Sequence, residues 1–266
     1  MRLRVVWTVC PLYEKYAVFA TGSRKKRGGG RALAAIELEN VDKSYRWNTK
    51  IQPAAQNITL SVRQGEFVFL IGNSGAGKST LLQLMTGGIK PERGTVRLYG
   101  QDYEKMSEKR RKAAALMFGY VWQEPQLMKR RTVFENVYRT ALVGECKCRS
   151  ATARERVQKA LGVTGMIPYA AMRAEELSLG QCRRMELSRA LVNNPSILIL
   201  DEITANLDPD NVWDIAFVLD EIHRHGTTII MATHSRSMVN IMRRRVITLS
   251  GGAVTSDVRR GRYGDI

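Results

Sequence analysis

The residues from Gly72 to Ser79 have the types and the spacing that phosphate chemistry requires. They read Gly-Asn-Ser-Gly-Ala-Gly-Lys-Ser, a glycine followed by four residues, Gly-Lys and a serine. The three glycines let the backbone curve so that several N–H groups point at one anion, and a helix that starts there adds partial positive charge. Lys78 would place a full charge on the outer phosphates of a nucleotide, and the Ser79 hydroxyl would be a ligand for a bridging Mg²⁺. This stretch therefore predicts a site for a nucleoside triphosphate with magnesium.

Four polar side chains at the ends of predicted strands could complete a phosphoryl transfer to water. Asp201 and Glu202 directly follow an apolar run, and ligands bind at the carboxyl ends of the strands of a parallel sheet. Asp201 could hold the magnesium, and Glu202 could act as general base for the attacking water. Gln123 could reach the magnesium or the water, and His234 could contact the γ-phosphate and keep Glu202 in register. Each residue alone is often only a loop start or a solvated strand end, but all four in one chain favour a catalytic site.

The elements that must carry these residues follow from the apolar patterns along the chain. Apolar runs bounded by turn residues predict buried strands, and one of them lies just before the glycine loop. The predicted strands are 36–41, 58–62, 67–71, 94–100, 118–122, 197–200, 227–233 and 246–249. The predicted helices are 80–85, 153–161, 183–192 and one that begins at Pro209 with Asp208 as its N-cap. Strand patterns disappear between about 124 and 180, which predicts a helical subdomain inserted in an α/β domain.

The chain has 266 residues and a net charge of +17, which is unevenly placed. Residues 1–35 hold eight lysines or arginines against one glutamate, and residues 243–266 hold six arginines against two aspartates. We expect 1–35 to be a disordered basic extension, 36–255 to form the folded domain and 256–266 to be a loose basic tail. A basic balance can indicate a nucleic-acid partner or an anionic membrane face, but it is also typical of a solvated surface with basic ends. A basic anchor for anionic lipid or RNA in residues 1–35 stays open as an alternative to plain disorder.

Cysteine content and hydropathy argue against a secreted and a membrane-spanning protein. The four cysteines are too few and too scattered for a disulfide framework, and no second Cys/His pair at metal-ligand spacing accompanies Cys146 and Cys148. The longest apolar stretch, 5–20, is too short for a membrane span and is interrupted by Glu14 and Lys15. We therefore expect a soluble, cytoplasmic protein that would reach a membrane by binding something there.

In type and order, these motifs resemble those of the ATPase subunits of ABC transporters, and the resemblance covers about residues 36–255. The matching segments are Gly72–Thr80, Gln123, Leu177–Gln181, Ile197–Glu202, Asn206–Asp208 and His234. The resemblance implies the ABC type of P-loop NTPase fold: a mostly parallel central sheet, an antiparallel β subdomain and an inserted α-helical subdomain. It also implies hydrolysis of ATP to ADP and phosphate, with Mg²⁺ as cofactor.

The resemblance also implies roles for individual residues. The implied nucleotide-binding residues are Tyr45, whose ring would stack on adenine, Gly72, Asn73, Ser74, Gly75, Ala76, Gly77, Lys78, Ser79, Thr80, Ser178 and Gly180. The implied catalytic residues are Glu202, His234 and Gln123, and the implied magnesium ligands are Ser79, Gln123 and Asp201. Two copies would pair head to tail, so that Ser178 and Gly180 of one copy contact the ATP held by Lys78 of the other.

Within this family, four segments are most similar to the FtsE type of cell-division ATPase. They are Gly75–Leu82, Arg131–Val137, Met231–His234 and Thr248–Ser250. This similarity implies a homodimer on the inner face of the cell membrane that drives or gates an FtsX-like integral membrane protein. The helical subdomain would dock on that partner, and Gln123 would link the contact to the ATP site. ATPases of lipoprotein release and of macrolide or peptide export are near neighbours and remain alternatives.

Several positions depart from the family pattern and bear on the rate of hydrolysis. Leu179 replaces a glycine that leaves room for the phosphates of the opposite ATP, Ile203 replaces a usual proline, and Ser235 replaces a frequent aspartate. Cys182 and Arg183 stand where two glutamines are common. We therefore expect slow, partner-dependent turnover, with an ATP-binding switch of little hydrolysis as the alternative. A nucleic-acid partner is not expected, because family members that act on ribosomes or nucleic acid usually carry two cassettes in one chain and this chain has one.

Overall fold

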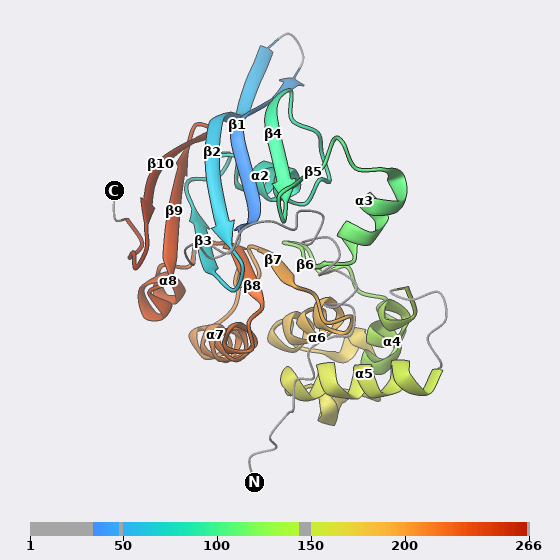
Figure 1. Cartoon of the computed structure of the whole chain (residues 1–266). Helices are drawn as coiled ribbons and strands as arrows, with labels where there is room; N and C mark the ends of the chain where they lie inside the picture. Colours follow the sequence, from blue (N-terminus) through green and yellow to red (C-terminus); the bar gives the residue numbers. More distant parts are fainter. Residues whose placement is uncertain (1–33, 48–49, 144–149, 265–266) are drawn as a thin grey trace.

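Two β-sheets and a block of helices make up the computed structural model, which describes residues 34–47, 50–143 and 150–264 (Figure 1). The larger sheet has six strands in the order β10-β9-β3-β8-β7-β6. Its strands are β3 (Phe67–Ile71), β6 (Phe118–Val121), β7 (Ile197–Asp201), β8 (Thr228–Ala232), β9 (Arg245–Ser250) and β10 (Ala253–Val258). All neighbouring strands are parallel except β9 and β10. The carboxyl ends of β3, β6, β7 and β8 therefore share one edge, where the glycine loop and the four polar side chains follow.

The smaller sheet is antiparallel, with the order β2-β1-β4-β5. Its strands are β1 (Ala34–Trp47), β2 (Lys50–Arg63), β4 (Arg93–Leu98) and β5 (Gln101–Asp102). The hairpin of β1 and β2 is much longer than the strands predicted at 36–41 and 58–62. Register shifts after Leu38 and Val41 interrupt the inward–outward alternation of β1. The distal part of the hairpin consequently lacks the regular alternation of apolar and polar residues from which a strand could have been predicted.

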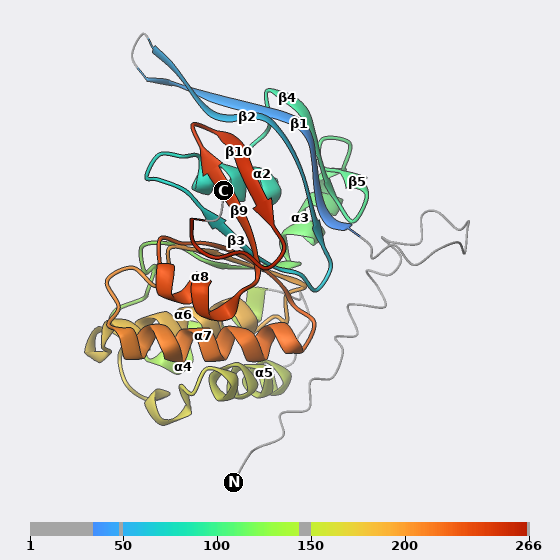
Figure 2. The same ribbon diagram turned by 90° about the vertical axis from the view of Figure 1, so that its left-hand side faces the viewer.

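Helices cover both faces of the larger sheet. The helices of the described residues are α2 (Lys78–Met85), α3 (Glu108–Ala115), α4 (Val133–Val143), α5 (Ser150–Val163), α6 (Leu179–Leu191), α7 (Pro209–Arg224) and α8 (Arg236–Met242), with 3-10 turns η1 (Ile167–Tyr169) and η2 (Ala174–Glu176). Helix α2 packs between the two sheets, and α6, α7 and α8 lie on the opposite face of the six-stranded sheet (Figures 1 and 2). Successive side chains of β3 point to opposite faces of the sheet, and both faces are buried. Val68 and Leu70 pack in the core that includes α2. Phe67, Phe69 and Ile71 pack in the core that includes α7.

A separate core holds the helical block between β6 and β7. Side chains of α4, α5 and α6 form it, with Val137, Val157 and Met185 fully buried. Between β6 and β7 the described residues contain helices, turns and a single isolated β-bridge, from Thr132 to Arg173. Across the described ranges, no helix combines the length and the apolar content of a membrane span. Helix α6 also contributes to the core under the large sheet, so it joins the helical block to that sheet.

The C-terminal segment corrects one expectation. The sequence predicts a loose tail from 256, but β10 runs to Val258 and pairs antiparallel with β9. Arg245 of β9 donates to the carboxylate of Asp257 through Nε and Nη2, both at 2.7 Å. The N–H of Gly261 then donates to the carbonyl of Arg244 at 3.1 Å. The prediction was wrong here because a cross-strand ion pair holds this edge strand, whose half-exposed polar residues carry no apolar pattern.

Candidate nucleotide-binding site

The loop between β3 and α2 is shaped around a space that an anion could fill. Gly72, Gly75 and Gly77 all have positive φ angles, of 149°, 77° and 99°, which side chains with a Cβ rarely permit. A Cβ at Gly72 would clash with the carbonyl oxygen of Leu249, and one at Gly77 would clash with the carbonyl oxygen of Ala54. A Cβ at Gly75 would meet no atom within 4 Å, so this side of the loop is open. Helix α2 starts directly after the loop, and its first N–H groups and dipole favour negative charge there.

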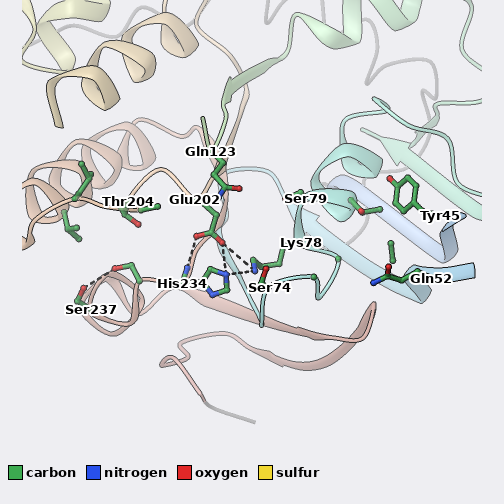
Figure 3. A pocket seen from close by; sticks show the side chains of 18 of the residues that line it. Tyr45, Gln52, Ser74, Lys78, Ser79, Gln123, Glu202, Thr204, His234 and Ser237 are labelled. Atoms are coloured by element: carbon green, nitrogen blue, oxygen red, sulfur yellow. Dashed lines mark hydrogen bonds and ion pairs between the residues drawn. The ribbon is translucent and has the colours of Figure 1, made fainter. Parts of the chain in front are cut away.

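Lys78 lies at the centre of the site. Only 7% of the residue is exposed, and its Nζ donates to the carbonyl oxygens of Gly72 at 2.9 Å and Asn73 at 3.2 Å. The same Nζ lies 3.0 Å from Nε2 of His234 and 3.6 Å from Oε1 of Glu202. One ammonium group therefore joins the glycine loop to two of the residues predicted to act in hydrolysis (Figure 3).

Glu202 is held by its neighbours in a single arrangement. Its carboxylate accepts the backbone N–H of His234 at 3.2 Å and lies 3.2 Å from Nε2 of the same histidine. Its backbone has a φ of 51°, a left-handed conformation that costs a residue with a Cβ about 1 kcal/mol. Strain of this kind is typical of functional sites, where the surrounding structure fixes the side chain. The predicted general base thus lies in direct contact with the residue predicted to bind the γ-phosphate.

Asp201 and Ser79 offer a fit for Mg²⁺. The Oδ1 atom of Asp201 is buried without a hydrogen-bond partner. Burial raises the pKa of this carboxyl, and a hydrogen bond from Ser79 and the charge of Lys78 oppose that shift. No group of three or more His, Cys, Asp or Glu side chains that could hold a metal occurs among the described residues. The unpartnered Asp201 oxygen and the Ser79 hydroxyl fit Mg²⁺, which binds through one or two protein oxygens and takes its other ligands from phosphates and water.

Lys78, Ser79, Glu202 and His234 line a pocket of about 770 Å³, large enough for a nucleotide (Figure 3). Asp201 is not among the residues that line it. Of the predicted site residues, the pocket is lined by Tyr45, Ser74, Gly75, Gly77, Lys78, Ser79, Thr80, Gln123, Glu202 and His234. Tyr45 and Gln52 lie at the end of the pocket away from Glu202. The Tyr45 residue is 43% exposed, so its ring is accessible for stacking on a base. Gly72, Asn73 and Ala76 shape the loop from behind rather than line the pocket.

Several residues that line the pocket were not among the predicted site residues. The missed residues are Gln52, Pro53 and Ala54 from β2, together with Thr204, Ala205, Pro209, Val212 and Ser237. The β2 residues carry no motif, because only the long hairpin brings them beside the glycine loop. The residues from 204 to 212 come directly after Asp201 and Glu202 in the sequence, and this closeness could have indicated that they line the pocket.

Ser178 and Gly180 lie outside this pocket. They stand at the start of α6, where Ser178 is the exposed N-cap and accepts the N–H of Gln181 at 3.3 Å. Gly180 is packed so closely against Asn211 of α7 that a Cβ would clash with the Asn211 side chain. Leu179 between them is 39% exposed. A single chain therefore brings Lys78, Glu202, His234 and Gln123 together in one pocket, whose lining does not include Ser178 or Gly180.

Replacing Tyr45 by alanine is expected to weaken ATP binding by about 5- to 30-fold, since stacking of a base on an aromatic ring contributes ~1–2 kcal/mol. The Tyr45→Phe variant is the matched control and should bind ATP as the unchanged protein does. Calorimetric titration with a non-hydrolysable ATP analogue measures both affinities. Equal affinities of the alanine and phenylalanine variants would contradict stacking at this position.

Comparison with known proteins agrees with this geometry. The family model described as ABC transporter matches residues 55–205. The cell division ATP-binding protein FtsE of Streptococcus pneumoniae (strain D39) is 37% identical over 233 residues, which cover 87% of this chain and 99% of the relative. The macrolide export ATP-binding/permease protein MacB of Chlorobium luteolum is 34% identical over 85% of this chain, but only 34% of the relative is covered.

The fold of this chain is also similar to the folds of solved ATP-binding cassettes. A dimeric post-hydrolysis state of the ATP-binding cassette MJ0796, bound to ADP and Pi, has a TM-score of 0.76 and 29% identity. The match covers 85% of this chain and 99% of that one. The family and the fold class predicted from the sequence are thereby confirmed. The chain belongs to the ABC transporter family, as one of its ATP-hydrolysing cassettes.

Proposed function

We propose that this ATPase works as a homodimer that closes on ATP and opens after hydrolysis, and thereby drives or gates an FtsX-like integral membrane protein in cell division. The observation that carries the proposal is the contact of Glu202 with both Lys78 and His234. It supports hydrolysis in addition to binding, because a carboxylate that could take a proton lies beside the ammonium group that would bind phosphate. The similarity to FtsE along nearly the whole of both chains supports the role in division.

In the proposed reaction the loop N–H groups and Lys78 bind the outer phosphates of ATP. Glu202 accepts a proton from the water that attacks the γ-phosphorus, the bond from this phosphorus to the β–γ bridging oxygen breaks, and ADP and phosphate leave. His234 holds Glu202 through its backbone N–H and can donate to the γ-phosphate. Mg²⁺, held by Asp201 and Ser79 with Gln123 in reach, would neutralise charge on the phosphates.

The exposed start of α6 supports dimerisation. Ser178, Leu179 and the backbone around Gly180 carry the family signature, yet they do not line the pocket of their own chain. A second copy placed head to tail would bring them over the ATP held by Lys78. The cassette MJ0796, to which this chain is similar, is itself dimeric, which supports pairing of two copies.

A groove of about 440 Å³ supports docking of a membrane partner. Parts of α3, β6, α4 and α6 line it, with Leu116, Trp122 and Val143 among its exposed apolar residues. An apolar helix or loop of an integral membrane protein would fit such a groove. Gln126 also lines the groove, three residues after Gln123 in the ATP site, so a docked partner would contact the segment that reaches the nucleotide. The protein would then lie on the inner face of the membrane through this partner.

A second candidate function is an ATP-binding switch with little hydrolysis. Leu179 favours it, because its exposed side chain would crowd the phosphates of the opposite ATP where the family usually has glycine. Single-turnover hydrolysis by the unchanged protein, compared with Glu202→Gln, separates the two candidates. A switch would show equally slow phosphate formation in both proteins.

Phosphate release by the purified protein tests the proposed function. We expect slow release by the protein alone and faster release when the cytoplasmic segments of the FtsX-like partner are added. Fast hydrolysis without any partner would contradict the proposal. Purification of the ATP-bound Glu202→Gln protein from membranes would show whether the partner is FtsX-like or a permease of lipoprotein release or export.

A further inference from the structure

Arg183 on α6 is buried against the backbone that carries Gln123. Only 3% of the residue is exposed. Its Nη1 donates to the carbonyl oxygen of Trp122 at 3.1 Å, and its Nη2 donates to the carbonyl oxygen of Gln123 at 2.5 Å. The planar guanidinium thus donates hydrogen bonds to two consecutive carbonyl groups, and it fixes their positions better than a flexible ammonium group would. The Gln123 side chain itself lines the nucleotide pocket.

Two more residues of α6 complete this attachment. Glu186, 5% exposed, accepts Nη1 of Arg183 at 2.9 Å through Oε2 and the backbone N–H of Gln126 at 3.3 Å through Oε1. Arg189 donates to the carbonyl oxygen of Gln126. The segment from 122 to 126 leads from the ATP site into the groove. Side chains of the single helix α6 therefore bind its backbone at Trp122, Gln123 and Gln126.

The charges of Arg183 and Glu186 are costly to bury, so their pairing is poor evidence of a purely stabilising role. Removing two charges from water costs several kcal/mol for each ion, and apolar replacements of similar volume are often equally stable. What an apolar pair could not supply is directed donors to the carbonyl oxygens of Trp122 and Gln123. The arrangement therefore specifies a position of the backbone rather than simply filling the core.

Arg183 lies on α6, the helix that begins at the signature, so the position of the Gln123 backbone depends on this helix. Leu179 begins α6, and Arg183 follows it by about one helical turn. A shift of the signature end of this helix would therefore move the Arg183 donor that holds the carbonyl of Gln123. We propose that Arg183, supported by Glu186, is a positioning residue that sets the reach of Gln123 into the ATP site and ties it to the signature of the same subunit. This inference rests on the ATPase function proposed above.

Two double variants that differ in one donor test the proposal. Both carry Glu186→Gln, which removes the buried charge and keeps an acceptor for the Gln126 N–H. The first adds Arg183→Gln, whose amide can still donate to a carbonyl, and the second adds Arg183→Met, which fills space without a donor. Thermal unfolding of both checks that they fold. We expect the Met variant to lose about 10- to 100-fold in kcat with KM for ATP within about threefold, and the Gln variant to keep kcat within about threefold.

Hydrogen exchange gives a second readout that a merely structural role would not change. When a non-hydrolysable ATP analogue binds, protection of 122–126 and of 178–183 should change together in the unchanged protein and separately in the Met variant. Equal kcat values in the two double variants, or a loss in KM alone, would overturn the inference and leave the ATPase function intact. Protection that still changes together in the Met variant would overturn it as well. An unchanged protein that does not hydrolyse ATP would refute the proposed function and with it this inference.

Discussion

Glu202→Gln is expected to reduce single-turnover ATP hydrolysis by at least about 100-fold while ATP still binds. The amide has nearly the same shape as the carboxylate but cannot take a proton from the attacking water, and a positioned general base contributes about 10²- to 10⁴-fold. Binding should survive because Lys78 and the loop amides are untouched, and because the lost negative charge no longer competes with the γ-phosphate for the Lys78 ammonium, 3.6 Å away. Quenched-flow measurement of phosphate, with calorimetry for ATP affinity, gives both quantities.

A matched control removes a carboxylate that has no place in the site. Glu155 on α5 is exposed, and Glu155→Gln should hydrolyse and bind ATP as the unchanged protein does. If Glu202→Gln formed phosphate at the same rate as this control, Glu202 would not be the general base. The ATP-bound dimer of Glu202→Gln should also persist for longer, which size-exclusion chromatography with ATP would detect.

The second large effect is expected for Lys78→Met, which should weaken ATP binding by about 30-fold or more. Methionine keeps most of the length of the side chain but has no charge, and a charge-assisted contact contributes ~2–3 kcal/mol. The buried Lys78 also donates to two carbonyl oxygens of the loop, so its removal loosens the loop itself. Hydrolysis should fall further than binding, because the same ammonium lies beside Glu202 and His234.

Titration calorimetry with a non-hydrolysable ATP analogue measures this loss. Lys90→Met is the matched control, because the Lys90 side chain is largely exposed and lies outside the pocket, so that ATP affinity should not change. The rise in melting temperature that ATP causes should also shrink in Lys78→Met, since only a ligand that binds the folded protein stabilises it. An affinity for ATP equal to that of the control would remove the basis for the nucleotide site.

The core of the site could be predicted because its signals are local. The glycine loop follows β3, and Glu202 follows β7, whose last residue is Asp201. Both strands are parallel to β8, which lies between them, so their carboxyl ends reach the same edge of the sheet. Gln52 to Ala54 could not be predicted, since they line the pocket only through the long β1–β2 hairpin, whose register shifts hide its pattern. Arg183 was visible only as a departure from the family. Its grip on Gln123 depends on packing between α6 and a loop about 60 residues earlier.

The contacts behind the glycine loop have a consequence for how this molecule can change shape. The loop is wedged between the carbonyls of Ala54 on the small sheet and Leu249 on the large one, and Gly252 donates to Ala76 while it accepts from Gln56. Sliding of one sheet over the other would push these backbone atoms into one another and break the hydrogen bonds of Gly252, so we expect the two sheets to move together as one unit.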